Sequence, residues 1–427
     1  MSSRTAVSER AVIFLIGAVQ FVNILDFVMV MPLAPYFSGS LGIDSAHIGI
    51  VAGSYTAAAS IAGLAGGYFL DRFDRRKALA VCMLGLVAAT ASAGLATGLY
   101  SMVAARVFAG IFGGPATSLA LAIIADLIPV ERRGKAMGAV MAAFSVAQVV
   151  GQPLSLKAAA LGGWRAPFLG VAAMGVVVAF VAIFFLPPVR GHLEKSNRPA
   201  HAVGVWELLS RRDVQLSYLM SALVMMSGFI IIPNIPAYVV HNLGFPLGDL
   251  WKLYLVGGVA SFITLRLTGP RVDRYGAFRI GTVGALLGVL LTYVGFVNYP
   301  VWLSMYVLFI GFMVAMGIRN VSYNTLTSRV PENAVRARFM SLQSAISHMA
   351  SALAAAVFAP MILKTLPDES LVGMEHVALV SMALALCVPP MLFIVERGVR
   401  AKAAAQAQTA GAPGGAMALA PSSSPQR

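Results

Sequence analysis

Twelve long apolar runs constrain the fold of this chain more than any other feature of its sequence. They lie at residues 11–36, 47–70, 78–98, 100–125, 136–160, 166–187, 214–240, 249–268, 278–297, 300–324, 339–365 and 376–395. A helix needs about 20 apolar residues to cross a bilayer, and backbone amides in lipid require internal partners. With 59% apolar and 11% charged residues, the chain is not an ordinary soluble enzyme. We expect an all-α membrane protein with twelve transmembrane helices.

The basic residues predict how these helices are oriented. Most of the 31 Lys and Arg lie at the termini or in loops after even-numbered runs, and Arg165, Lys252 and Lys364 lie in the opposite loops. Both termini are therefore expected in the cytoplasm, in the plasma membrane (the bacterial inner membrane). The first run is too long for a signal-peptide core and should be retained as a span. The net charge of +14 thus indicates orientation in lipid and no nucleic-acid partner.

The chain repeats itself at an offset of 202 residues. The matching pairs are Phe27 and Phe229, Tyr36 and Tyr238, Gly42 and Gly244, Gly67 and Gly269, Asp71 and Asp273, and Pro129 and Pro331. Such repetition predicts two pseudo-symmetric six-helix bundles. We place an N-terminal bundle at 1–187, a cytoplasmic linker at 188–213, a C-terminal bundle at 214–398 and a disordered cytoplasmic tail at 399–427. The tail is rich in Ala, Gly, Pro, Ser and Gln, which pack poorly.

A charged motif follows the second run and returns after the eighth. The first copy is Gly67-Tyr-Phe-Leu-Asp71-Arg72-Phe-Asp74-Arg75-Arg76-Lys77, and the second is Gly269-Pro-Arg-Val-Asp273-Arg274-Tyr-Gly276. The duplicated motif resembles the loop motif of the major facilitator superfamily, with Asp74 where that family usually has glycine. The resemblance covers about residues 10–398 and implies the major facilitator fold. Because glycine tolerates left-handed dihedrals better than aspartate, Asp74 raises the question of the turn geometry.

The resemblance also implies a conformational latch that holds the two halves together when the cavity faces outward. The latch residues are Gly67, Asp71, Arg72, Arg76, Asp126, Asp273 and Arg274. Arg72 is expected to pair with an acid across the cytoplasmic surface, and Asp126 is the obvious candidate. In the alternative interpretation, the basic residues serve only as topology anchors.

The fourth run carries an arginine and a face of small residues. Arg106, Gly110, Gly113 and Gly114 share this face, where small side chains let a helix or a substrate approach the backbone. The segment resembles the fourth-span motif of drug:proton antiporters, with Ala109 in place of the usual glutamine, and the resemblance implies that Arg106 couples to protonation. An intramembrane arginine is functional by default. The alternative is that Arg106 extends toward the membrane surface.

Asp26 is the acid that lies well inside an apolar run. The segment Leu25-Asp26-Phe-Val-Met-Val-Met-Pro32 resembles the first-span motif of the same antiporters. Gln20, Asn23 and Asp26 recur every three residues and form one polar stripe, which we expect to face water or the translocation cavity. Desolvation and a nearby cation act in opposite directions on a carboxylate, as a proton carrier requires. In the alternative, Asp26 only contacts a cationic substrate.

Spans one, four, seven and ten line the cavity in this superfamily. The expected cavity and substrate residues are Gln20, Asn23, Asp26, Gly110, Ser227, Asn234, Tyr238 and Tyr323. In the fifth run, Gly151-Gln152-Pro153 looks like an antiporter Gly-Pro motif with Gln152 inserted. Lys157 follows it, either as an amine that reaches the surface or as a charge at the outer gate.

These features together predict a proton-coupled secondary transporter. The expected function is efflux of small lipophilic or cationic compounds by alternating access of the two halves. Alternatives are efflux of a sugar, amino acid or lipid-like metabolite, proton-coupled uptake, and a membrane sensor that does not transport. No phosphate-binding loop or convergent catalytic set is found, so an enzyme is not expected. The expected partners are a small-molecule substrate, protons and the bilayer. We expect a monomer without cofactor or metal.

Overall fold

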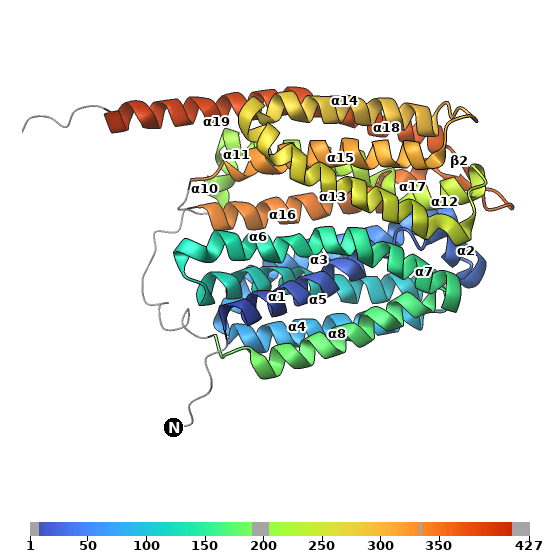
Figure 1. The fold of residues 1–427 in the computed structure, drawn as a ribbon, viewed down its shortest axis with the longest axis horizontal. Helices are drawn as coiled ribbons and strands as arrows, with labels where there is room; N and C mark the ends of the chain where they lie inside the picture. The colour runs from blue at the N-terminus through green and yellow to red at the C-terminus, as the bar shows by residue number, and fades with distance from the viewer. Residues whose placement is uncertain (1–7, 190–204, 333–334, 412–427) are drawn as a thin grey trace, which may run out of the picture.

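The computed structural model describes residues 8–189, 205–332 and 335–411 and is almost entirely helical (Figure 1). Within these residues, 12 helices are long and apolar enough to cross a membrane, which confirms the predicted fold class. The first group comprises α1 (Glu9–Val28), α2 (Ala34–Leu41), α3 (Ile48–Phe69), α4 (Arg75–Gly94), α5 (Leu99–Leu127), α6 (Val130–Val146), α7 (Gln152–Gly162) and α8 (Arg165–Phe185). Large apolar side chains such as Phe14, Leu161 and Phe184 are exposed, as contact with lipid requires.

The second group of helices follows α10 (Val205–Ser210), which falls inside the predicted linker. It comprises α11 (Arg212–Phe229), α12 (Ile235–Ala237), α13 (Leu250–Tyr275), α14 (Ala277–Phe296), α15 (Met305–Ser328), α16 (Arg336–Leu353), α17 (Ala359–Ile362), α18 (Met374–Leu386) and α19 (Val388–Gly411). Strands β1 (Lys364–Thr365) and β2 (Leu371–Val372) form an antiparallel hairpin between α17 and α18. The rest of the linker, 190–204, lies outside the described residues.

The two groups lie side by side and meet along two helix pairs. Helix α3 packs against α16, and α7 packs against α13. Between the groups, the rings of Phe27 and Phe229 stack with their centroids 6.3 Å apart. These two residues are related by the 202-residue offset, so one matched pair of the repeat forms a contact between the groups. The exact boundaries at 187 and 214 stay a prediction.

Proline interrupts helices at matching places in the two groups. Between α1 and α2 the chain leaves the helix near Pro32, and between α11 and α12 it does so at Pro233, because proline lacks a donor N–H and crowds the preceding turn. A π-helical turn at 147–151 precedes Pro153, and another at 354–358 precedes Pro360. A π-turn accommodates one extra residue in a helix. It therefore explains how the fifth span tolerates the inserted Gln152.

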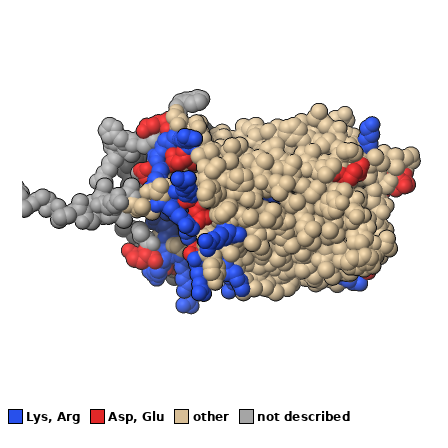
Figure 2. Space-filling view, turned by 90° about the horizontal axis from the view of Figure 1, so that it is seen from above, with Lys and Arg blue, Asp and Glu red and all other residues tan. Residues whose placement is uncertain are grey.

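Charge is gathered at one end of the molecule (Figure 2). We call this the basic end; it includes Arg72, Arg132 and Arg336. We call the opposite end, which carries β1 and β2, the hairpin end. Helix α19 continues at the basic end to Gly411, past the predicted start of disorder at 399. The Ala-rich sequence there favours a helix, and the remainder, 412–427, lies outside the described residues.

Contacts between the two groups close the hairpin end. Ser38 donates a hydrogen bond to Glu369 at 2.9 Å, and the backbone N–H of Ala46 donates to the Thr365 hydroxyl at 3.0 Å. The amine of Lys157 lies 5.2 Å from the centre of the Trp251 ring, a cation–π contact across the interface. Lys157 thus lies at the contact between the groups with its side chain exposed, and its role at the outer gate stays a prediction.

A glycine in α3 is required for this closure. A Cβ atom added at Gly49 would overlap the backbone carbonyl of Ala355, whereas one added at Gly63 of the same helix would meet nothing within 4 Å. Overpacking of this kind costs about 1–3 kcal/mol, and here the cost applies only when the hairpin end is closed. We therefore expect Gly49→Ala to increase the population of an opened hairpin end about tenfold, with Gly63→Ala unchanged.

Spin labels at the exposed positions Ser40 and Asp368 measure this population, because the two positions belong to different groups. In the distribution of distances between the two spin labels, the longer distance should become more populated in Gly49→Ala only. Identical distance distributions in the two variants would show that the close approach at Gly49 does not control closure.

Candidate functional site

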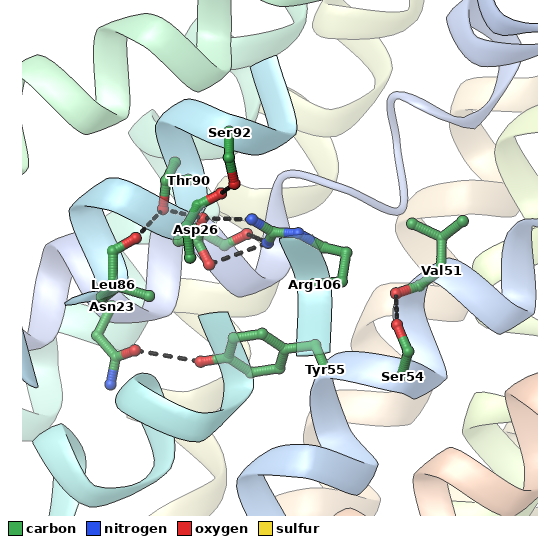
Figure 3. A network of polar contacts seen from close by, with 10 residues as sticks. Asn23, Asp26, Val51, Ser54, Tyr55, Leu86, Thr90, Ser92 and Arg106 are labelled. Atoms are coloured by element: carbon green, nitrogen blue, oxygen red, sulfur yellow. Dashed lines mark hydrogen bonds and ion pairs between the residues drawn. The ribbon is translucent and has the colours of Figure 1, made fainter. Parts of the chain in front are cut away.

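The polar stripe of α1 is buried inside the first group of helices. The exposed fractions of Gln20, Asn23 and Asp26 are 1%, 3% and 0%. Asp26 faces Arg106 of α5, with Nη1 3.0 Å from Oδ2 and Nη2 3.1 Å from Oδ1 (Figure 3). Nη1 also lies 3.3 Å from the backbone oxygen of Asp26. Asp26 and Arg106 therefore form a bidentate ion pair, which is the strongest geometry for a carboxylate and a guanidinium.

Thr90 of α4 completes the surroundings of this pair. Its hydroxyl oxygen lies 2.7 Å from Oδ1 of Asp26 and 2.8 Å from the backbone oxygen of Leu86 (Figure 3). One hydroxyl has a single proton to donate, so it can serve only one of these acceptors at a time. The ring of Phe168 covers the guanidinium of Arg106 at 5.6 Å. Thr90 was not singled out in the sequence, because a lone threonine in an apolar helix gives no signal.

Asn23 belongs to a second polar cluster one turn away. Its amide nitrogen donates to the Gly113 carbonyl at 2.9 Å and to the Thr117 hydroxyl at 2.7 Å. Its carbonyl oxygen accepts a hydrogen bond from the Tyr55 hydroxyl at 3.1 Å (Figure 3). These bonds join α1, α3 and α5, and Asn23 lies among these helices in the structure.

The small residues of α5 are covered by α3. A Cβ atom at Gly110 would lie 2.9 Å from that of Ala58, and one at Gly114 would lie 2.6 Å from the backbone oxygen of Ala59. The small residues were expected to let either a helix or a substrate approach the backbone, and in the structure a helix does so. Gly110 is not among the described residues that line the cavity of about 600 Å³, and its expected contact with substrate stays a prediction.

A cavity of about 600 Å³ lies between the two groups. Its wall is largely aromatic and aliphatic. The described residues that contribute include Phe27, Met31, Phe144, Phe229, Tyr254, Phe309, Phe312, Met313 and Met316, with polar groups from Gln148, Gln152, Arg319, Asn320, Tyr323, Asn324 and His348. Such a wall suits one small, mostly apolar compound with a few polar anchors.

Of the residues expected to contact substrate, Tyr323 belongs to this wall. The others lie elsewhere in this conformation. Ser227 accepts a hydrogen bond from Arg319, Asn234 bonds to the Ile230 carbonyl, and the Tyr238 ring packs on Phe296. Gln20, Asn23 and Asp26 are buried and are not among the described residues of the wall. The sequence shows which helices carry polar residues. It does not show whether each of these residues faces a neighbouring helix or the cavity.

The predicted latch residues lie at the basic end. Asp126 forms an ion pair with Arg75 at 3.2 Å rather than the expected one with Arg72, which is exposed. Arg76 donates to the Leu186 carbonyl at 3.0 Å. Arg72 ends the short turn at 70–72 before α4, whereas Arg75 is the first residue of α4. This difference in position decides which arginine reaches α5. The surroundings of Gly67 and of the Asp71 side chain lie outside the described residues.

Asp74, the departure from the motif, forms the N-cap of α4. Its φ of −56° is not left-handed, and its carboxylate accepts hydrogen bonds from the backbone N–H groups of Arg76 and Val189. The position therefore does not need glycine here. In the second copy of the motif, Asp273 pairs with Arg329 at 2.6 Å, and Arg274 lies over the Tyr275 ring at 5.3 Å.

Solved structures resemble the whole architecture. A bacterial homologue of the human lysosomal transporter Spinster, in an inward-facing and occupied conformation, aligns with a TM-score of 0.75 at 17% identity and covers 92% of this chain and 98% of that chain. A D-xylose-proton symporter aligns with a TM-score of 0.73 at 16% identity and covers 89% and 96%. At these identities, the likeness concerns the fold.

Curated relatives are distant and carry different transport names. The chloramphenicol resistance protein of Streptomyces lividans is 27% identical over 61% of this chain and 66% of its own length. Multidrug resistance protein 2 of Bacillus subtilis is 24% identical over 68% and 74%, and the cis,cis-muconate transport protein of Acinetobacter baylyi is 23% identical over 81% and 84%. The family model described as Major Facilitator Superfamily matches residues 16–355. This multi-pass membrane protein therefore belongs to the Major Facilitator Superfamily, and it is a secondary transporter rather than an enzyme.

Proposed function

We propose that the protein exports small, largely apolar compounds across the plasma membrane of a bacterium in exchange for protons. The observation that carries this proposal is the fully buried ion pair of Asp26 and Arg106, in which Asp26 directly precedes two residues of the cavity wall in the sequence. Helix α1 contributes both: Asp26 to the pair, and Phe27 and Val28 to the wall. A change in the charge of Asp26 therefore acts on the helix that the substrate contacts.

The coupling step begins with proton binding at Asp26. While the carboxylate is ionised, it attracts Arg106 and accepts a hydrogen bond from Thr90. Protonation removes the attraction to Arg106, and the Thr90 hydroxyl then turns to the Leu86 carbonyl, which lies within 2.8 Å. An arginine left without its carboxylate in a buried site is costly. This cost favours a movement of α5 against α1 and so links proton binding to the rocking of the two groups.

The orientation and the latch are parts of the same proposal. We place the basic end in the cytoplasm, because Lys and Arg favour cytoplasmic loops. The ion pair of Asp126 with Arg75 lies within the first group, and that of Asp273 with Arg329 lies within the second. Asp71 and Arg72 then act as the latch, and Asp71→Asn should shift the populations of the two states while the protein still folds.

Thr90→Val tests the hydroxyl switch. Valine keeps the shape of threonine but cannot donate a hydrogen bond, and a bond to a charged group is worth about 1.5 kcal/mol. We expect the pH profile of gradient-driven transport to move up by about one unit, with folding preserved. Thr117→Val is the matched control, because that hydroxyl accepts a hydrogen bond from the Asn23 amide and does not contact Asp26. Profiles that coincide for wild type and Thr90→Val would remove Thr90 from the mechanism.

The function itself is tested in proteoliposomes that enclose a pH-sensitive dye. A panel of apolar drugs, carboxylates and sugars is added, and proton movement that depends on each compound is recorded. We expect at least one amphiphilic compound to drive protons in the opposite direction. Compound transport without proton movement, or with protons in the same direction, would contradict antiport.

A further inference from the structure

A buried arginine lies in the wall of the central cavity with neutral partners. Arg319 of α15 is 5% exposed. Its Nη1 donates to the Ser227 hydroxyl at 3.0 Å and its Nη2 to the Val224 carbonyl at 3.4 Å. Its Nε has no hydrogen-bond partner in the described part of the chain. Burying a guanidinium is costly unless an anion compensates it.

The wall around Arg319 carries no compensating acid. Among the described residues that line the cavity, Arg319 is the only Lys, Arg, Asp or Glu. Arg106 in the other group differs in this respect, because its guanidinium is matched by the carboxylate of Asp26. The wall of the cavity therefore holds one positive charge that no described acidic residue of the wall compensates.

The internal repeat identifies the position in the second group that corresponds to the carboxylate of Asp26. Offset by 202 residues, the position of Asp26 corresponds to Gly228 of α11. Gly228 also lines the cavity, and a Cβ atom added there would lie 3.4 Å from Nη2 of Arg319. The second group thus has a glycine at the position of Asp26, and this glycine lies beside Arg319, which the same offset relates to Thr117 and not to Arg106.

We propose that Arg319 binds the carboxylate of an amphiphilic substrate, whose apolar part lies against the aromatic and methionine side chains of the wall. This inference rests on the proposed function and specifies its substrate class. Arginine presents paired donors that fit a carboxylate. Tyr323, one turn away, and Asn320 add polar groups on the same part of the wall, while Phe229, Met313 and Met316 supply apolar contact.

The test uses three probes that share one carbon skeleton and differ in charge. They are 4-phenylbutyrate, its neutral amide and 4-phenylbutylammonium, each titrated into purified protein in detergent, with binding measured calorimetrically at pH 7. We expect the carboxylate to bind at least about tenfold more tightly than the amide and the ammonium. Arg319→Gln should remove that preference, and Arg319→Lys should retain part of it. A carboxylate that binds no better than the amide, or equally well to Arg319→Gln, would overturn the proposal.

A second variant tests the site without removing the arginine. Gly228→Asp places a carboxylate beside Arg319 and should weaken binding of the probe carboxylate at least about tenfold, while Gly228→Asn, of the same size, should not. Equal weakening in both variants would show that size rather than charge acts at this position, against the proposal.

These binding tests need no proton gradient, so they fail or succeed independently of the proposed antiport. Carboxylate binding through Arg319 without proton movement in proteoliposomes would leave this inference standing and contradict antiport. Proton-coupled export of neutral compounds without a preference for carboxylates would support antiport and contradict this inference.

Discussion

Asp26→Asn should abolish gradient-driven transport while leaving exchange of substrate intact. Asparagine has nearly the same size and, like the protonated acid, is neutral with one oxygen left to accept hydrogen bonds. It carries no titratable proton, so α1 can still move and nothing links its movement to the gradient. With one proton exchanged per substrate, a pH difference of two units supports a concentration ratio of about 100, because each unit is worth about 1.4 kcal/mol. The ratio should fall to about one in the variant.

The measurement is the steady-state substrate ratio in proteoliposomes, with the membrane potential held at zero by valinomycin and equal potassium on both sides. Counterflow of labelled substrate in the same vesicles shows that the variant is folded. Asp249→Asn is the control, since that carboxylate is exposed at the hairpin end and pairs only locally with Lys252. A ratio near 100 in Asp26→Asn would place the proton site elsewhere.

Arg106→Gln should cause the second large effect, on stability. It leaves the Asp26 carboxylate buried at 0% exposure without its cation, and the loss of one partner from a buried pair costs about 3–5 kcal/mol. We expect a reduction of that size in the free energy of unfolding, measured by denaturant titration in mixed micelles at pH 7.

The double variant Asp26→Asn with Arg106→Gln distinguishes pairing from packing. It removes both charges and should recover most of the lost stability, because neither group is then left charged and unpaired. Arg165→Gln, at the surface, should be close to neutral. A double variant as unstable as Arg106→Gln alone would show that Arg106 stabilises the bundle by its bulk.

Much of the fold could be predicted from the sequence because bilayers impose simple rules. Apolar length indicates the spans, and the 202-residue repeat brings Phe27 to Phe229 in the structure. The contact between Asp26 and Arg106 could also be predicted from the sequence, since both are isolated charges at similar depth in apolar helices. In lipid, each has a strong reason to find the other.

The cavity wall was less accessible to sequence reasoning. A polar residue in a span can face a neighbouring helix or the cavity, and only packing decides between them. Asn23 faces Tyr55 and Gly113, so a polar stripe expected to face water lies inside a bundle. Arg319 is a charged residue within the tenth apolar run, but its neutral partners depend on Ser227 of a helix about ninety residues away in the sequence.

Proton release on substrate binding tests the central claim most directly. Purified protein in weakly buffered detergent solution is mixed with a saturating transported compound, and the released protons are counted with an indicator dye at several pH values. The account predicts release by wild type in the pH range where Asp26 is protonated, and no release by Asp26→Asn although the compound still binds. Equal release by the two proteins would contradict the assignment of the transported proton to Asp26.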